Sequence, residues 1–192
     1  MGAKSKNDVP DAKDRLLRAA IDVLAASGWR AATCREIAKR AQVNLGLINY
    51  YYEGKDALLI AALDQAMAQL SAQMPDLKGF PSFAAFARKM MELAIDMAKS
   101  PQIKIIFEAT LQAPHHPALA ELIQNYLSLF RQNLEVALHT LVSQRPQNTA
   151  MAIALAALFD GALLHAMIDP QVNMPQSLEM AIGFFLREEQ GS

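Results

Sequence analysis

The sequence predicts an all-α protein with a small N-terminal helical domain and a larger helical domain after it. Apolar residues recur three and four positions apart through long segments, and no segment alternates with period two for long enough to form a strand. Prolines and glycines fall between these segments, where helices would end. Of the 192 residues, 53% are hydrophobic and 19% are charged, which provides material for a core and for a buried subunit interface.

The first helix is indicated by apolar residues at helical spacing between Leu16 and Leu24. We expect residues 1–9 to be a disordered basic lead, and Gly28 to close the helix in a left-handed conformation. Thr33 and Glu36 form a capping-box pattern, in which each side chain satisfies a free backbone N–H at the start of a helix. This pattern predicts a second helix over 34–41.

A third helix follows a turn of about three residues and is capped by Asn44. Leu45, Ile48 and Tyr52 are spaced to form its buried stripe, and Val43 would fill the turn. The remaining side chains would then point to solvent, and these are Gly46, Leu47, Asn49, Tyr50 and Tyr51. A short helix has little structural reason to expose an asparagine and tyrosines unless that surface binds something. The spacing therefore predicts a helix-turn-helix domain over 10–55, whose third helix could enter a DNA major groove.

Residues 56–192 form the predicted second domain. Ala-, Leu- and Met-rich segments separated by prolines indicate helices over 56–74, 81–98, 102–113, 118–143, 147–168 and 176–188. The last two are so apolar that one subunit can rarely bury both, which predicts a homodimer that packs them against their copies.

The charge distribution and the cysteine content narrow the possible classes of function. Residues 1–56 carry ten Lys and Arg against seven Asp and Glu, whereas the rest of the chain is acidic. The single cysteine, Cys34, fits a reducing cytosol. No uninterrupted apolar run reaches the roughly 18 residues that span a bilayer, so we expect a cytoplasmic protein without membrane contact. Adjacent His115 and His116 make a poor metal pair, and nothing indicates catalysis, a metal or a cofactor.

The pattern T-x-R-E-I-A-x-x-A-x-V-N-x-G-x-I-x-Y-Y-Y-x-x-K-x-x-L resembles the DNA-binding domain of the tetracycline-repressor (TetR) family of bacterial transcription regulators. The resemblance is specific over residues 12–60 and rests on length and helix count elsewhere. It implies that Thr33 and Lys55 contact phosphates and that Arg35 reaches a base edge or the backbone. It implies that the remaining contacts to DNA come from Asn44, Leu45, Gly46, Leu47, Asn49, Tyr50 and Tyr51.

Three positions depart from the family pattern. Asn49 stands where a phosphate-binding tyrosine is usual and could instead read adenine N6 and N7. Gln42 replaces a turn glycine, which costs about 1 kcal/mol of backbone strain. Gly54 replaces a capping serine, so the cap before Lys55 is weakened.

The resemblance also implies that the second domain, over 56–192, binds a small-molecule effector, which we expect to be largely apolar. Residues expected to bind it are Phe83, Phe86, Met90, Phe107, Leu111, Tyr126, Phe130 and Asp160. Each of the apolar ones could equally be ordinary core. Asp160 has only apolar neighbours three and four positions away, so its carboxylate should be buried and satisfied structurally or should lie in a pocket or an interface. Glu108, by contrast, shares a face with Lys104 and is expected to be a solvated ion-pair partner.

These observations together predict a homodimeric regulator, most simply a repressor, that binds a near-palindromic double-stranded DNA operator and is released by an effector. The alternative from another class is a helical ligand-binding or interaction protein whose first three helices serve as a docking module. The sequence names neither the effector nor the operator, and it leaves repression and activation open.

Overall fold

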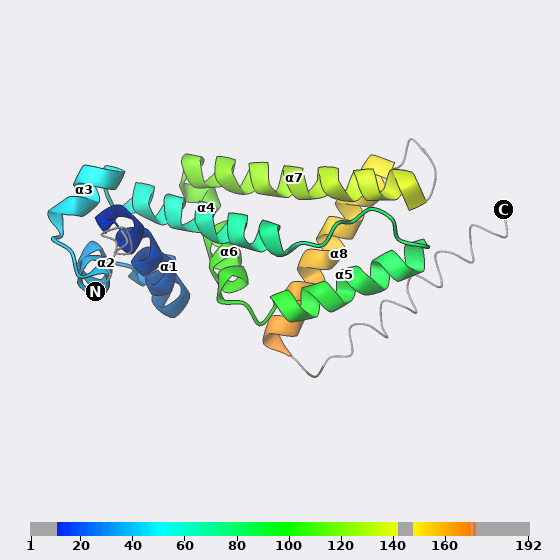
Figure 1. The fold of residues 1–192 in the computed structure, drawn as a ribbon, viewed down its shortest axis with the longest axis horizontal. Helices are drawn as coiled ribbons and strands as arrows, with labels where there is room; N and C mark the ends of the chain where they lie inside the picture. Colours follow the sequence, from blue (N-terminus) through cyan, green and yellow to red (C-terminus); the bar gives the residue numbers. More distant parts are fainter. Residues whose placement is uncertain (1–10, 142–147, 170, 172–192) are drawn as a thin grey trace, which may run out of the picture. The chain divides into compact units, whose positions relative to one another are not determined.

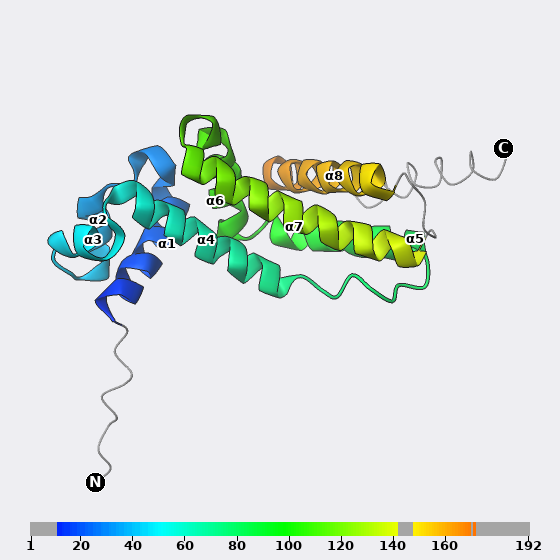
Figure 2. The same cartoon turned by 90° about the horizontal axis from the view of Figure 1, so that it is seen from above.

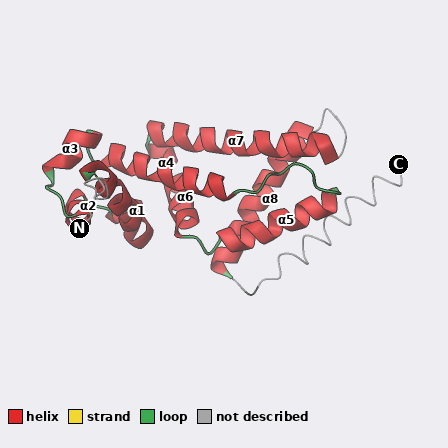
Figure 3. Cartoon of the chain, viewed as in Figure 1, coloured by secondary structure: helices red, strands yellow, loops and turns green. Residues whose placement is uncertain are grey.

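The computed structural model describes residues 11–141, 148–169 and 171, and within these residues all regular structure is helical (Figure 3). The all-α prediction is therefore confirmed. The predicted lead over 1–9 and the predicted last helix over 176–188 lie outside the described residues. The helices are α1 (Ala12–Ala31), α2 (Cys34–Ala41), α3 (Gly46–Tyr52), α4 (Lys55–Gln73), α5 (Phe83–Met97), α6 (Pro101–Gln112), α7 (Pro117–Leu141) and α8 (Asn148–Ile168), with a 3-10 turn at Ala113–His115.

The chain forms two compact units. The first contains the residues up to Met74 together with Lys104–Gln124, and the second contains Pro75–Ile103 and the residues from Asn125 onward. Helices α6 and α7 each begin in one unit and continue into the other, so they join the units covalently. The predicted boundary at residue 56 falls inside the first unit and stays a prediction.

Helices α1 to α4 pack together in the first unit, where α1, α2 and α3 gather at one end of α4 (Figure 1; Figure 2). Apolar side chains from each helix form the core there; Leu16, Ile37, Ile48 and Leu59 are essentially inaccessible to solvent. Burial of each such side chain contributes about 1.5–3 kcal/mol relative to exposure. This core holds the short helix α3 in place, although a helix of that length is unstable by itself.

Helix α1 is interrupted at Gly28, which has φ 79° and ψ 175°. The predicted positive φ is confirmed, but ψ is extended rather than left-handed helical, and the helix resumes for one further turn to Ala31. A Cβ atom at Gly28 would collide with the carboxylate of Glu108. Two requirements therefore select glycine here, namely its backbone conformation and the close approach of a side chain from α6.

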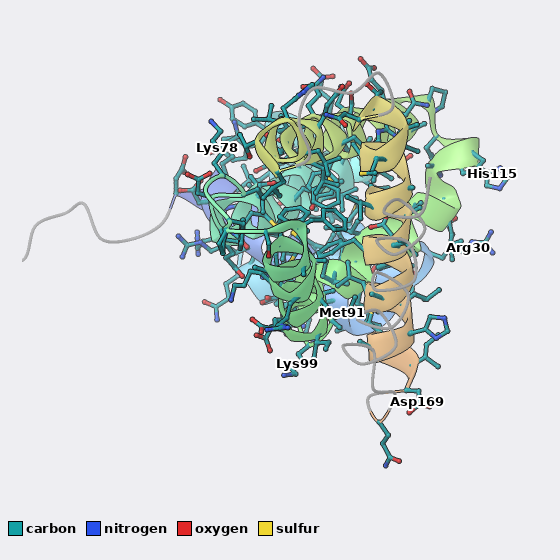
Figure 4. All side chains as sticks on the ribbon, turned by 90° about the vertical axis from the view of Figure 1, so that its right-hand side faces the viewer. Arg30, Lys78, Met91, Lys99, His115 and Asp169 are labelled. Carbon is teal, nitrogen blue, oxygen red and sulfur yellow. The ribbon has the colours of Figure 1, made fainter. Side chains whose placement is uncertain are left out.

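In the second unit α5 packs against α8. Phe86 is fully buried on α5, where its ring lies 5.5 Å from that of Phe80 and 6.2 Å from that of Phe83. Met91 is also buried, on the side of α5 toward α8 (Figure 4). Buried apolar residues on both helices, among them Ala94 of α5 and Ala162 of α8, accompany this packing.

Helix α8 keeps large apolar side chains in solvent, namely Ile153, Leu158, Leu164 and Ile168. By length and composition alone it is the one described helix that could cross a membrane. Because it carries Asp160 near its middle, its composition is weak evidence for a membrane span. An apolar face of this kind also suits contact with another protein surface.

Candidate nucleic-acid interface

The start of α2 is fixed by Thr33. Its Oγ1 accepts a hydrogen bond from the Glu36 backbone N–H at 3.2 Å, with the Thr33 backbone extended at φ −119°. The Thr33 half of the predicted capping box is thus observed, and α2 has the predicted bounds. Arg35 follows in the first turn and is exposed. Thr33 and Arg35 therefore stand together at an exposed helix N-terminus, where backbone N–H groups favour anions.

The turn between α2 and α3 depends on two local features. Gln42 adopts the left-handed conformation at φ 55° and ψ 47°, as expected for a position where a glycine is usual. Arg15 donates to its carbonyl oxygen at 3.4 Å, from α1. Asn44 Oδ1 then accepts from the Gly46 N–H at 2.9 Å, which confirms the predicted cap. The turn leaves Asn44 and Gly46 exposed at the start of α3.

Helix α3 is anchored by Ile48 and Tyr52, which are 1% and 8% exposed. The Tyr52 hydroxyl donates to the backbone carbonyl of Lys13 at 3.0 Å, and the Lys13 ammonium lies 5.8 Å from the centre of the Tyr52 ring. Leu45 was predicted to belong to this buried stripe and does not, because it is 45% exposed. Its backbone is helical, at φ −53° and ψ −37°, but it is the first residue in that conformation. A side chain on a helix leans toward the N-terminus, and here that direction leads past the end of the helix into solvent.

The outer surface of α3 carries Asn49 and Tyr50, with Tyr50 77% exposed. The Tyr50 ring packs edge-on against Tyr51 at a centroid distance of 4.9 Å. Leu47 and Tyr51 are half-buried. The side chains of α3 that were predicted to face solvent therefore differ in exposure: Asn49 and Tyr50 are exposed, whereas Leu47 and Tyr51 are partly buried by the rest of the domain.

Cations flank this surface. Lys55 begins α4 directly after Gly54, whose φ of 128° is one that a serine would adopt only with strain. Glycine at this position thus allows the backbone conformation of the turn but provides no side chain to cap the start of α4. On α2, Arg40 is paired with Asp22 at 3.4 Å. Neither Arg35 nor Lys55 has an ion-pair partner among the described residues, so both remain free to bind phosphate.

The predicted effector residues are divided between the two units. Phe107 and Leu111 lie on α6 in the first unit, and Leu111 is 74% exposed. The second unit contains Phe83, Phe86, Met90, Tyr126, Phe130 and Asp160. Phe86 and Met90 are buried in the packing of α5.

Asp160 on α8 is partly buried, and burial raises the pKa of its carboxyl group to about 6. Burial also raises the pKa of the Tyr126 phenol on α7, and the nearby charge of Asp160 raises it further. These two groups therefore lie in one partly desolvated region of the second unit. Among the described residues, no group of three or more His, Cys, Asp or Glu is placed to hold a metal.

An exposed helix, fixed by a capped partner helix and flanked by free cations, defines a helix-turn-helix DNA-binding module, here attached to further helices. This is the class of a transcriptional regulator. Two family models match the chain: bacterial regulatory proteins of the tetR family over residues 16–62, and the C-terminal part of BetI-type transcriptional repressors over residues 85–189. The chain belongs to the TetR family of transcriptional regulators.

Curated relatives agree over most of the chain. A nicotine-responsive transcriptional repressor, HdnoR of Paenarthrobacter nicotinovorans, is 27% identical and covers 83% of this chain and 86% of its own. The regulator BetI of Vibrio campbellii is 28% identical, covering 92% of this chain and 91% of its own. A crystal structure of a transcriptional regulator from a Rhodococcus species has 29% identity and a TM-score of 0.73, covering 92% of this chain and 96% of its own. The family and these relatives are regulators of transcription and not enzymes.

Proposed function

We propose that the protein is a cytoplasmic homodimeric repressor that binds a near-palindromic operator and is released by a small-molecule effector. The observation that carries the DNA-binding part is the exposure of Asn49 and Tyr50 on a helix whose other face is anchored by Ile48 and Tyr52. In this proposal Asn49 reads a base edge and Arg35 reads a second one, because amides and guanidinium groups match adenine and guanine edges. Thr33, Tyr51 and Lys55 hold the phosphates on either side.

The repressor assignment is supported by the BetI-type repressor model over residues 85–189 and by the name of the nicotine-responsive relative. Those relatives also support control by a small molecule. An effector acts through its different affinity for two conformations of the dimer. The two helix-turn-helix domains of the dimer must match DNA half-sites about 34 Å apart, or a multiple of that distance. A small change in the separation of these two domains would therefore release DNA.

The dimer is supported by the exposed apolar face of α8, which has Ile153, Leu158, Leu164 and Ile168 on it. Burial of such a face against its copy gives a self-complementary interface with two-fold symmetry. The glycine in the middle of this helix, Gly161, has open space where a Cβ would be, so a second helix could approach there closely.

The test is a salt titration of DNA binding by fluorescence anisotropy, with the upstream region of the protein's own gene and a shuffled duplex of equal length and composition. We expect tight binding of the upstream region, with affinity falling steeply as salt rises. Equal affinity for the two duplexes would refute the repressor and favour the interaction-module alternative. Substitution of a lysine outside the proposed interface should leave the affinity for both duplexes unchanged. Lys99→Ala is such a control for Lys55→Ala, because Lys99 is an exposed lysine of the second unit paired with Asp96.

A further inference from the structure

Three side chains from α6 and the turn after it contact the last turn of α1, which leads into α2. Glu108 accepts a hydrogen bond from the Trp29 backbone N–H at 2.8 Å. Arg30 Nε donates to Gln112 Oε1 at 3.4 Å, and the His116 ring lies 6.2 Å from the Trp29 ring. Glu108 and Gln112 are four residues apart and share one face of α6. Two consecutive residues of α1 are therefore held from one side.

A short path of hydrogen bonds joins this contact to the start of α2. The Ala32 N–H donates to the Gly28 carbonyl oxygen at 3.1 Å, and the Ala32 side chain is fully buried. Thr33 follows directly, and its hydroxyl caps α2 through the Glu36 N–H. Only three residues separate Trp29 from Thr33, so the backbone has little freedom to move one without the other. The position of Trp29 therefore determines where α2 begins.

We propose that Glu108 is a positioning residue for DNA binding. By holding the Trp29 N–H, it sets the direction in which the chain enters α2 and so places Arg35, on the first turn of α2, against DNA. This inference rests on the proposed function, since it assigns a further residue to the same DNA-binding activity. A binding group must be held to within about 0.5 Å of its productive position, so a small displacement of α2 is enough to lose the contact. A carboxylate repels phosphate, and Glu108 therefore acts through the link between α1 and α2.

The experiment separates this role from electrostatics, because the two predict changes of opposite sign. Loss of an acidic charge near DNA reduces the repulsion of phosphates, so charge alone would strengthen binding. We expect Glu108→Ala instead to weaken binding to the upstream region of the protein's own gene about fivefold or more, the value of one base contact. Glu108→Gln loses the same charge but keeps an acceptor oxygen, and it should stay within about twofold of the wild type. The proposal is overturned if the alanine variant binds no more weakly than the wild type or the glutamine variant, as measured by fluorescence anisotropy.

A double-mutant cycle tests the route through α2. If Glu108 acts by placing Arg35, Glu108→Ala should weaken binding only about twofold or less once Arg35 is already alanine. A merely structural role would weaken the Arg35→Ala protein by the same factor as the wild type. In the single Glu108→Ala variant, sequence preference should relax at the base pair where Arg35→Ala relaxes it and should persist elsewhere. Equal factors in the two backgrounds would overturn the proposal.

Two control variants account for charge and for stability. Glu121→Ala removes an exposed acid of the same unit, on α7, and should not weaken DNA binding. Ile105→Val trims a buried side chain of α6 itself, so it lowers stability without altering the hydrogen bond to Trp29. A loss of DNA affinity in Ile105→Val equal to that in Glu108→Ala would assign the effect to stability and overturn the proposal. Circular dichroism verifies that each variant is folded.

Hydrogen exchange measured by mass spectrometry separates this inference from the proposed function. In Glu108→Ala, the protection of backbone amides should fall over residues 28–36 and should persist in α3. A wild-type protein without preference for its own upstream region contradicts the repressor, and the exchange result then decides whether Glu108 places α2. Unchanged protection over residues 28–36 would overturn the inference whatever the DNA result.

Discussion

The Glu108 carboxylate of α6 accepts a hydrogen bond from the Trp29 backbone N–H at 2.8 Å, at the kink of α1. Two further contacts surround it: Arg30 Nε lies 3.4 Å from Gln112 Oε1, and the Trp29 ring lies 6.2 Å from that of His116. The expectation that Glu108 is a solvated ion-pair partner of Lys104 is therefore wrong. Helix α6 begins in the second unit and continues into the first. The Glu108–Trp29 hydrogen bond therefore connects the first-unit part of α6 to α1 of the helix-turn-helix domain.

Glu108→Ala should lower the free energy of unfolding by about 1–2 kcal/mol, because it leaves the Trp29 N–H without its acceptor. Glu108→Gln retains a carbonyl oxygen at that position and should cost less than the alanine variant. Urea denaturation of both variants measures the difference, with Glu121→Ala, an exposed acid, as the control. Equal losses for the alanine and glutamine variants would show that the hydrogen bond contributes nothing.

Gly28→Ala should destabilise the protein by roughly 2 kcal/mol or more, through a strained positive φ and a collision with Glu108. Gly79→Ala is a control for the positive φ alone, since Gly79 has φ 81° but open space around its Cβ position. It should cost only the backbone term, about 1 kcal/mol. Differential scanning calorimetry measures both variants, and a Gly79 loss as large as the Gly28 loss would exclude the collision.

The pH dependence of stability should carry the signature of Asp160. Its pKa is raised from 3.8 to about 6 in the folded protein, so ionisation of Asp160 costs no stability below about pH 4, and the cost develops as pH rises through 6. At pH 7, Asp160→Asn should be more stable than the wild type by about 1 kcal/mol, a figure reduced for solvent screening because the group is partly exposed. The two proteins should converge near pH 4, as measured by urea denaturation across this range. A constant difference at every pH would contradict this prediction.

Lys55→Ala should weaken binding to every duplex alike and reduce the salt slope by about one, because one phosphate contact is lost. Arg35→Ala should in addition relax the preference at one base pair, by about 1–3 kcal/mol. Anisotropy titrations against a set of single-base-pair variants of the bound site distinguish the two outcomes. An Arg35 variant whose sequence preference is unchanged would limit Arg35 to the backbone.

Leu164→Arg on the exposed face of α8 should shift the protein toward monomer, because it places a charge in an apolar interface. The expected change is about tenfold or more in the dimer dissociation constant, measured by analytical ultracentrifugation. Leu129→Arg is the control, since Leu129 is an exposed leucine on α7. If both variants remain dimeric, the dimer uses another surface.

The local features of the helix-turn-helix domain were predictable from sequence, because they depend on residues close together in the chain. The Thr33 cap spans three positions and the Asn44 cap spans two, and Gln42 lies at the helix end where a left-handed residue is needed. Helical spacing failed for Leu45, because a side chain on the first helical residue leans past the end of the helix into solvent. The helix bounds over 12–112 followed the prolines, glycines and caps to within a few residues.

The contacts that couple distant segments were decided by tertiary structure alone. Glu108 meets Trp29 across 79 positions, and nothing near either residue in sequence indicates the other. Likewise, Asp160 was recognised as unusual from its apolar neighbours, but only the fold, in which Phe130 of α7 contacts Phe159 of α8, brought its charge near Tyr126. Short-range hydrogen bonds and helical periodicity depend on residues near one another in the chain. The sequence by itself therefore determined the helices and the helix-turn-helix domain. Long-range partners depend on how whole helices pack, and only the folded chain determined them.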